Sequence, residues 1–198
     1  MSYNVTYHTK GGEGGNEKAL ICIDYTNDFI AADGKLTCGE PGRKIEDAVT
    51  RLAETFIQNG DYVVFAVDSH ETGDTRHPET RLFPPHNIKG TSGQDLYGKL
   101  EALYRKHEHN QNIYYMEKTR YSAFAGTNLE LKLRERDIKE LHLVGVCTDI
   151  CVLHTAVDAY NKGFNLVIHQ NAVASFNPDG HDWALSHFAN TLGASVSG

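Results

Sequence analysis

Hydrophobic residues along the chain gather in short continuous runs separated by more polar segments. The runs lie at 19–25 (ALICIDY), 62–68 (YVVFAVD), 112–118 (NIYYMEK), 140–146 (ELHLVGV) and 164–169 (FNLVIH). Short apolar runs of this kind, rich in β-branched and aromatic residues, are typical of strands. Because polar residues do not alternate regularly within them, they predict strands that are buried on both faces of a sheet.

Helical periodicity follows or separates these runs. In 44–58 apolar residues recur every three or four positions, and Gly60 follows where a left-handed residue can end a helix. Further helices are predicted at 129–135, 149–161 and 180–192. Repeated β/α order with doubly buried strands predicts an α/β fold, in which a mostly parallel central sheet forms the middle of three α/β/α layers.

The first 18 residues differ from the rest of the chain. Residues 1–18 are polar and glycine-rich and show no hydrophobic period. They predict a flexible leader, or sequence added to a natural chain, ahead of one domain at 19–198. With 198 residues, 40% of them hydrophobic, the chain is long enough to bury one substantial core.

Charge and hydropathy argue against nucleic acid and membranes as binding partners of this protein. A net charge of −7 with scattered basic residues would repel nucleic acid. No apolar run approaches the roughly 20 residues that cross a bilayer, and no secretory signal is recognisable. We therefore expect a cytoplasmic protein that binds neither nucleic acid nor membranes. Its four cysteines are expected to be free thiols rather than a disulfide framework.

Three ionisable side chains stand at or just after the ends of predicted strands: Asp24, Lys118 and Cys151. The carboxyl ends of parallel strands meet at one edge of a sheet, where reacting groups collect. The start of a helix at this edge favours the thiolate form of the Cys151 side chain. Lys118 and Asp24 would then be the neighbouring cation and base. Taken singly, each residue is as well explained by burial, a turn or solvation. Their shared placement favours catalysis.

A second polar cluster follows the predicted strand at 62–68. Asp68 and His70 are two residues apart, so they point the same way along an extended chain. Glu79 and His86 follow on a long loop that can fold back onto them. Imidazole and carboxylate ligands suit zinc, iron or manganese, although polar loops of this composition are often only solvated. His77, on the same loop, is a competing ligand candidate.

Five motifs resemble the isochorismatase-like cysteine hydrolases and, within them, the nicotinamidases. In order they are IDYTNDF (23–29), DSH (68–70), LFPPH (82–86), KTRYSAF (118–124) and GVCTDICV (145–152). The similarity runs from about residue 19 to the last predicted helix. The first and last motifs mark the superfamily, whereas DSH and LFPPH are more particular to nicotinamidases.

The resemblance implies a role for each residue at the strand ends. Asp24 would be the general base, Cys151 the nucleophile, and Lys118 the cation that holds both. The backbone N–H groups of Cys147 and Cys151 would bind the oxyanion, next to a cis peptide bond between Val146 and Cys147. Many relatives have alanine at position 147, so the sulfur of Cys147 is not expected to be a second nucleophile.

The resemblance also implies a divalent metal, with zinc favoured over iron or manganese. Its ligands would be Asp68, His70 and His86, with Glu79 as a direct or water-mediated fourth. The aromatic residues that would hold the substrate ring are Phe29, Phe83 and Tyr121, for which ordinary core packing is the alternative. A homo-oligomer is implied as well.

The activity implied is hydrolysis of the small molecule nicotinamide to nicotinate and ammonia through a cysteine thioester, a step of NAD salvage. Pyrazinamide is an expected further substrate. One alternative is another amidase of this superfamily that acts on a carbamoyl or ureido compound, although such relatives generally lack the metal loop. A binding protein that keeps the fold without catalysis is the other, and the intact Asp24, Lys118 and Cys151 argue against it.

Overall fold

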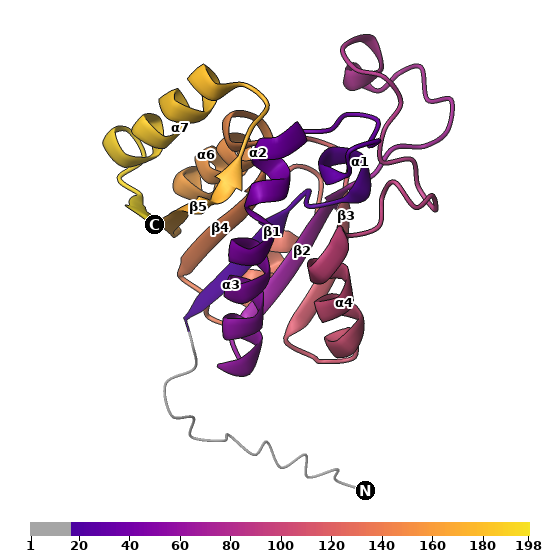
Figure 1. The fold of residues 1–198 in the computed structure, drawn as a ribbon. Coiled ribbons are helices and arrows are strands. Elements are labelled where there is room, and N and C mark those ends of the chain that lie inside the picture. Colours follow the sequence, from indigo (N-terminus) through magenta and orange to yellow (C-terminus); the bar gives the residue numbers. More distant parts are fainter. Residues whose placement is uncertain (1–16) are drawn as a thin grey trace, which may run out of the picture.

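The computed structural model describes residues 17–198, which form one sheet covered by helices on both faces (Figure 1). Its six strands have the order β3-β2-β1-β4-β5-β6, and every neighbouring pair is parallel. The strands are β1 (Lys18–Ile23), β2 (Tyr62–Asp68), β3 (Ile113–Lys118), β4 (Glu140–Val146), β5 (Asn165–Ala174) and β6 (Ser195–Ser197). The predicted α/β fold is confirmed, with a sheet that is parallel throughout the described residues.

The helices follow the strands in the expected order. They are α1 (Asn27–Ile30), α2 (Gly39–Lys44), α3 (Glu46–Gln58), α4 (Gly98–His107), α5 (Leu129–Arg134), α6 (Leu153–Asn161) and α7 (Pro178–Asn190). A 3-10 turn, η1 (Pro78–Arg81), and a π-helical turn, η2 (Thr148–Val152), carry residues of the site described below.

Alternate side chains of β1 face two separate cores. Ile21 and Ile23 join a core with α5, α6 and α7, whereas Leu20 and Cys22 join a core with α1, α3 and α4. All seven residues of β2 are buried. The apolar runs therefore form central strands covered on both faces, and the three predicted layers are present.

Several boundaries differ from those predicted. The leader predicted at 1–18 lies outside the described residues as far as position 16, and Lys18 already belongs to β1. The first strand ends at Ile23 rather than at position 25, because Asp24 turns the backbone with φ 54°. The helix predicted at 149–161 begins instead with η2, and α6 starts at Leu153. Hydrophobic patterns miss β6, which has three residues.

The carboxyl ends of the central strands meet at one edge of the sheet. Asp68 and Lys118 are register partners at the ends of β2 and β3. Near the end of β4, Gly145 has φ 114°, and an added Cβ there would lie 2.0 Å from the carbonyl oxygen of Ile23. Glycine therefore lets β4 approach β1 closely just before Asp24, which brings the chemistry-bearing residues together.

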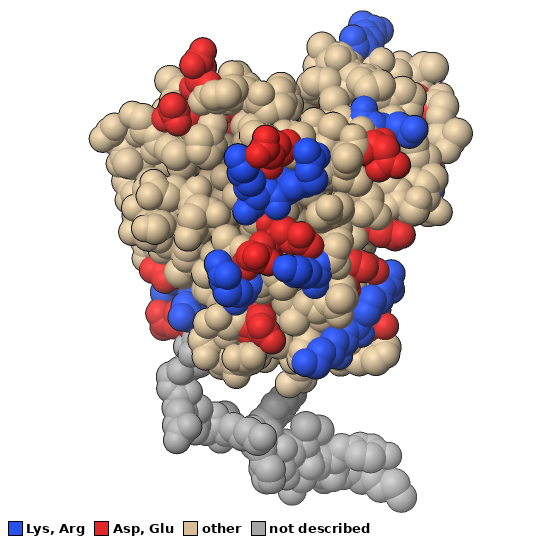
Figure 2. Space-filling model, in the orientation of Figure 1, with Lys and Arg blue, Asp and Glu red and all other residues tan. Residues whose placement is uncertain are grey.

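Charged side chains are mixed on the face of the molecule that Figure 2 shows. Exposed ion pairs join Lys44 to Glu40 at 2.8 Å and Lys99 to Asp47 at 2.6 Å. Such solvent-exposed pairs contribute little to stability. On this face basic side chains thus lie beside acidic ones. Within residues 17–198 no helix is long and apolar enough to cross a membrane.

Candidate active site

The structure brings Asp24, Lys118 and Cys151 into direct contact. The Lys118 Nζ lies 2.7 Å from an Asp24 carboxylate oxygen and 3.8 Å from the Cys151 Sγ. Lys118 is 1% exposed and Asp24 is 0% exposed, so the ion pair is shielded from water. Three residues from separate strand ends therefore form one buried cluster, as expected from the parallel sheet.

Backbone geometry aims the Asp24 carboxylate. The strained φ of 54° at Asp24 is held by its N–H, which donates to the carbonyl of Ala66 at 3.0 Å. One carboxylate oxygen accepts the backbone N–H of Asp68 at 2.8 Å, and the other faces Lys118. An unusual backbone conformation kept in place by such contacts is typical of a functional site.

Burial sets the protonation of this cluster. Burial raises the pKa of Asp24 to about 6, although the positive charge of Lys118 opposes the rise. Burial alone would lower the pKa of Lys118, but the negative charges of Asp24, Cys151 and Asp68 outweigh it and raise that pKa. Burial, and then the charge of Asp24, raise the pKa of Cys151 well above its usual value. The raised pKa favours a protonated resting thiol that needs a base, whereas the sequence pattern favoured a thiolate.

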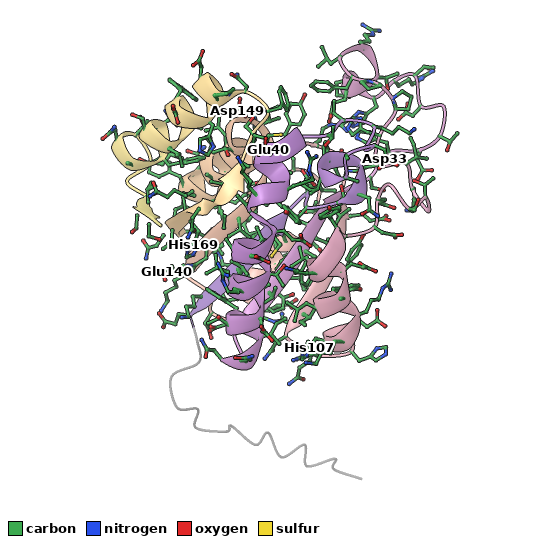
Figure 3. All side chains as sticks on the ribbon, in the orientation of Figure 1. Asp33, Glu40, His107, Glu140, Asp149 and His169 are labelled. Carbon is green, nitrogen blue, oxygen red and sulfur yellow. The ribbon has the colours of Figure 1, made fainter. Side chains whose placement is uncertain are left out.

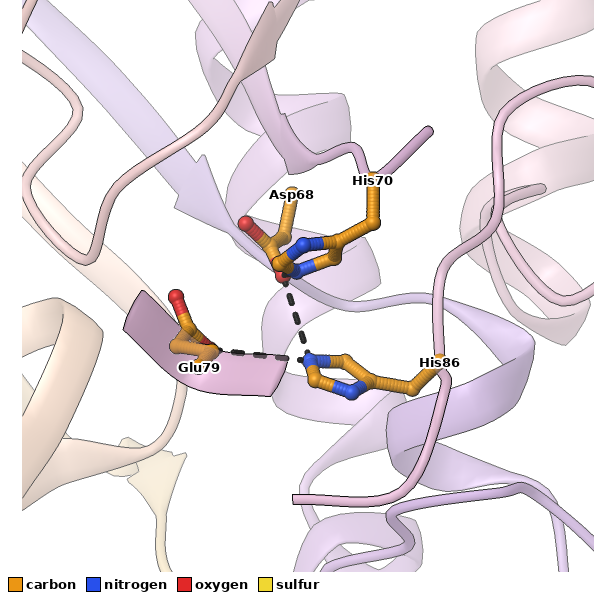
Figure 4. Close-up of side chains that lie close together, drawn as sticks. All are labelled: Asp68, His70, Glu79 and His86. Atoms are coloured by element: carbon orange, nitrogen blue, oxygen red, sulfur yellow. Dashed lines mark hydrogen bonds and ion pairs between the residues drawn. The ribbon is translucent and has the colours of Figure 1, made fainter. Parts of the chain in front are cut away.

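Asp68, His70, Glu79 and His86 form a compact group of ligand atoms, all within 4.8 Å of one another (Figure 4). The Nε2 of His70 lies 2.6 Å from an Asp68 oxygen, and the Nε2 of His86 lies 3.4 Å from the same oxygen. Glu79, on η1, approaches His86 at 3.7 Å. The four residues named by the metal hypothesis are thus brought together.

The donor atoms of this group fit a divalent cation. The Nε2 of His86, which faces the carboxylates of Asp68 and Glu79, is buried without a hydrogen-bond partner. The other ring nitrogen of His86, Nδ1, donates to the carbonyl of Pro84 at 2.8 Å, which points Nε2 into the group. Burial would lower the pKa of His86, but the nearby carboxylates of Asp68 and Glu79 raise it to about 10. A bound proton and a bound cation would compete for the same nitrogen.

His77, the competing candidate, has both ring nitrogens engaged elsewhere. Its Nε2 donates to the carbonyl of Thr119 at 2.7 Å, and its Nδ1 accepts the backbone N–H of Glu79 at 3.3 Å. His77 therefore holds η1 in place and is not in the ligand group.

Residues that sequence reasoning missed hold the His86 segment. An Asp28 carboxylate oxygen accepts the backbone N–H of Asn87 at 2.8 Å, and the Thr26 hydroxyl donates to the Asn87 side-chain oxygen at 2.9 Å. Asn87 adopts φ 43°, a conformation in which asparagine is favoured. Thr26 and Asp28 lie inside the motif IDYTNDF. The motif could be recognised in the sequence, but the contacts of these two residues with Asn87 became visible only in the structure.

One pocket joins the thiol to the metal-ligand group. It is lined by the predicted aromatics, by additional apolar residues, by two cysteines and by two carboxylates of the metal-ligand group: Phe29, Leu36, Asp68, Glu79, Phe83, Tyr121, Cys147, Ile150, Cys151 and Phe176. The ring of Phe29 lies 5.4 Å from that of His86, and the ring of Phe83 lies 6.2 Å from it. Apolar walls with a few convergent polar groups are typical of a small-molecule site. Leu36, Ile150 and Phe176 were not expected from the sequence.

The turn before Cys151 is tied to the segment after β5. The Val146–Cys147 peptide bond is cis, as the resemblance implies. The Thr148 hydroxyl lies 2.8 Å from the Nδ1 of His181, and the Ser175 hydroxyl donates to Asp149 at 2.6 Å. The backbone around Cys147 and Cys151 is thereby fixed at the pocket wall.

Comparisons with known proteins show the family of this chain. The isochorismatase domain model matches residues 18–197. An uncharacterized isochorismatase family protein, PncA of Bacillus subtilis, is 77% identical over 181 residues, covering 91% of this chain and 99% of that protein. A crystal structure of nicotinamidase/pyrazinamidase PncA from Bacillus subtilis has 74% identity and a TM-score of 0.91, with 91% of this chain and 99% of that chain covered.

A more distant solved structure also shares the fold. The pyrazinamidase of Pyrococcus horikoshii in complex with zinc is 27% identical, with a TM-score of 0.79 over 91% of this chain and 98% of that one. The matched segment spans nearly every described residue, including both groups of site residues. The chain therefore belongs to the isochorismatase family.

Proposed function

We propose that this protein is a metal-dependent nicotinamidase that hydrolyses nicotinamide to nicotinate and ammonia, with pyrazinamide as a further substrate. The observation that carries the proposal is the shared pocket, whose wall contains both the Cys151 thiol and the ligand residues Asp68 and Glu79. An amide bound between them would meet a nucleophile at one end and a metal at the other. High similarity to a nicotinamidase/pyrazinamidase supports the assignment.

The chemistry begins with a proton transfer. Asp24, with a pKa of about 6, is ionised near neutral pH and takes the Cys151 proton as the sulfur attacks the amide carbonyl. Lys118 balances the negative charge passed between these two groups. The backbone N–H groups of Cys147 and Cys151 stabilise the oxyanion. Asp24 then gives the proton from Cys151 to the amide nitrogen, which leaves as ammonia. The ionised Asp24 next deprotonates the water that releases nicotinate from the thioester.

The residues that would hold the metal are Asp68, His70, Glu79 and His86. A divalent metal held there would supply a Lewis acid for the pyridine nitrogen and help to orient the ring. Two imidazoles and two carboxylates suit zinc, iron or manganese, and the zinc complex of the Pyrococcus horikoshii relative favours zinc. Phe29, Phe83 and Tyr121 would enclose the ring.

We also propose a cytoplasmic homo-oligomer. Exposed large side chains support the oligomer: Trp183 on α7 is 56% exposed and Tyr160 on α6 is 50% exposed. Aromatic side chains are enriched at interfaces between subunits. Light scattering on purified protein would give the subunit number, and a monomer at all concentrations would refute the oligomer.

Ammonia release from a small panel of amides tests the activity. The metal-loaded protein should hydrolyse nicotinamide and pyrazinamide, and removal of the metal by a chelator should suppress both reactions. A carbamoyl or ureido substrate serves as the comparison, because the metal-ligand group disfavours that alternative. Hydrolysis of the ureido compound alone, or no hydrolysis of any amide, would refute the proposal.

A further inference from the structure

Two buried thiols lie against each other at the pocket wall. The Sγ atoms of Cys38 and Cys147 are 3.0 Å apart, and both cysteines are free. Cys147 lines the pocket together with Cys151, whereas Cys38 does not line it and is 2% exposed. The proposed hydrolysis uses the sulfur of Cys151 alone, so it leaves this pair of thiols without a role.

The backbone fixes both sulfurs. The N–H of Cys38 donates to the carbonyl of Phe29 at 2.7 Å, and a Cβ added at Gly42 would lie 3.0 Å from the Cys38 Cβ. Cys147 directly follows β4 and the cis peptide bond. Two segments that are 109 residues apart in the chain thus hold the thiols in register. Their contact is a feature of the packed fold.

We propose that Cys38 and Cys147 form a reversible disulfide when the enzyme is exposed to hydrogen peroxide, and that this bond lowers hydrolytic activity. The Cys147 sulfur attacks a peroxide oxygen, the O–O bond breaks, and water leaves a sulfenic acid. The Cys38 sulfur then attacks the Cys147 sulfur and displaces hydroxide, which departs as water with the Cys38 proton. Two thiols and one peroxide give one disulfide and two waters.

The pocket gives the oxidant a route to the pair. Peroxide is small enough to enter where the substrate does, and Cys147 is exposed there at 6%. The hydrogen bond with Cys38, and then burial, raise the pKa of Cys147 well above its usual value. Because the thiolate is the reactive form, the pair responds to sustained rather than trace peroxide.

Disulfide formation would displace the oxyanion-binding backbone. An S–S bond is about 2 Å long, so the two sulfurs must approach by roughly 1 Å from their present separation of 3.0 Å. A misplacement of about 1 Å at a catalytic group lowers rates on the order of 100-fold. We therefore expect kcat of the linked enzyme to fall at least about tenfold.

Peptide mapping identifies which two cysteines the disulfide joins. The full-length, metal-loaded protein is treated with hydrogen peroxide at pH 8, alkylated in denaturant, and cleaved before each aspartate. Such cleavage places the four cysteines on separate peptides, namely 1–23, 33–46, 137–148 and 149–157. The expected product joins peptide 33–46 to 137–148, accumulates as ammonia release falls, and disappears with recovered activity after dithiothreitol.

Cys38→Ser is the matched control. It should keep basal activity, form no such link, and lose activity more slowly in peroxide, with Cys38→Ala replacing it if the serine variant is unstable. Absence of the link in peroxide-inactivated wild type, or a linked enzyme with full activity, would overturn the inference. Of the two measurements, only the fall in ammonia release rests on the proposed function. A reduced wild type that releases no ammonia would refute that function, while the mass of the link still tests the thiol site.

Discussion

Asp68 and Lys118 connect the metal-ligand group to the thiol cluster. They are register partners on adjacent strands, and one carboxylate oxygen of Asp68 lies 3.7 Å from the Lys118 Nζ. The other Asp68 oxygen faces His70 and His86. Burial would raise the pKa of Asp68, but the positive charge of Lys118, a hydrogen bond with His70 and the nearby His86 imidazole hold it well below its usual value. The two halves of the site therefore share one ionised carboxylate.

Replacing Lys118 should damage both stability and activity. Lys118→Met removes the cation between two buried carboxylates, Asp24 and Asp68, and loss of one partner of a buried pair costs about 3–5 kcal/mol. Urea unfolding should show this loss. The double variant with Asp24→Asn should regain part of the stability yet remain inactive, since the base is gone. A single variant as stable as wild type would contradict the buried ion pair.

His86→Ala should lose bound metal while keeping most of its folding stability. Its imidazole supplies one of the four clustered ligand atoms, and removal of one ligand should weaken metal affinity by at least tenfold. Elemental analysis after dialysis against limiting zinc measures this. His77→Ala is the comparison on the same loop and should retain more metal, because both of its ring nitrogens are engaged elsewhere. Equal metal retention by both variants would remove His86 from the ligand set.

Gly145→Ala should be strongly destabilising. A Cβ there would lie 2.0 Å from a backbone oxygen of β1, and φ is 114°. We expect at least about 3 kcal/mol of lost unfolding free energy, or no soluble protein. Gly126→Ala is the control, since φ is 72° there but nothing lies within 4 Å of the added atom. That variant should lose only about 1 kcal/mol. Similar losses at both positions would show that the close approach is unimportant.

Stability should fall in mild acid because of a histidine pair far from the site. Figure 3 shows Glu140 and His169 at the opposite end of the sheet from Asp149. The Nδ1 of His142 lies 2.9 Å from the Nε2 of His169, and Glu140 contacts the other nitrogen of His142. Burial, and then the charge of His142, lower the pKa of His169 to about 4, and burial lowers that of His142.

The direction of this change in unfolding free energy follows from the number of protons that the folded and unfolded chains bind. Between about pH 6.5 and pH 4 the unfolded chain binds protons that the folded His169 rejects, so unfolding free energy decreases as pH falls through this window. With a discount for partial exposure, the loss attributable to His169 is about 1 kcal/mol between pH 7 and pH 5. Urea titrations of wild type and His169→Asn should differ by this amount in their pH dependence. Parallel curves would contradict the shift.

The central strands were predictable because their apolar runs are uninterrupted, and the parallel arrangement placed Asp24 and Lys118 correctly at one edge. The sequence could not show the protonation of Cys151, which depends on burial by residues distant in the chain. It also could not show that Asp28 holds Asn87, a contact across 59 residues. The pairing of Cys38 with Cys147 was hidden for the same reason: local pattern carries no information about which side chains meet across two layers.

The most direct test compares ammonia release from nicotinamide by wild type, Cys151→Ala and Cys147→Ala, each with its metal content measured. Both cysteines line the pocket, but only Cys151 contacts Lys118. Nucleophilic catalysis by Cys151 predicts that Cys151→Ala releases no ammonia above background while binding metal as wild type does. Cys147→Ala should keep at least about a tenth of the rate, because its role is confined to the backbone. Turnover by Cys151→Ala within about tenfold of wild type would contradict the account.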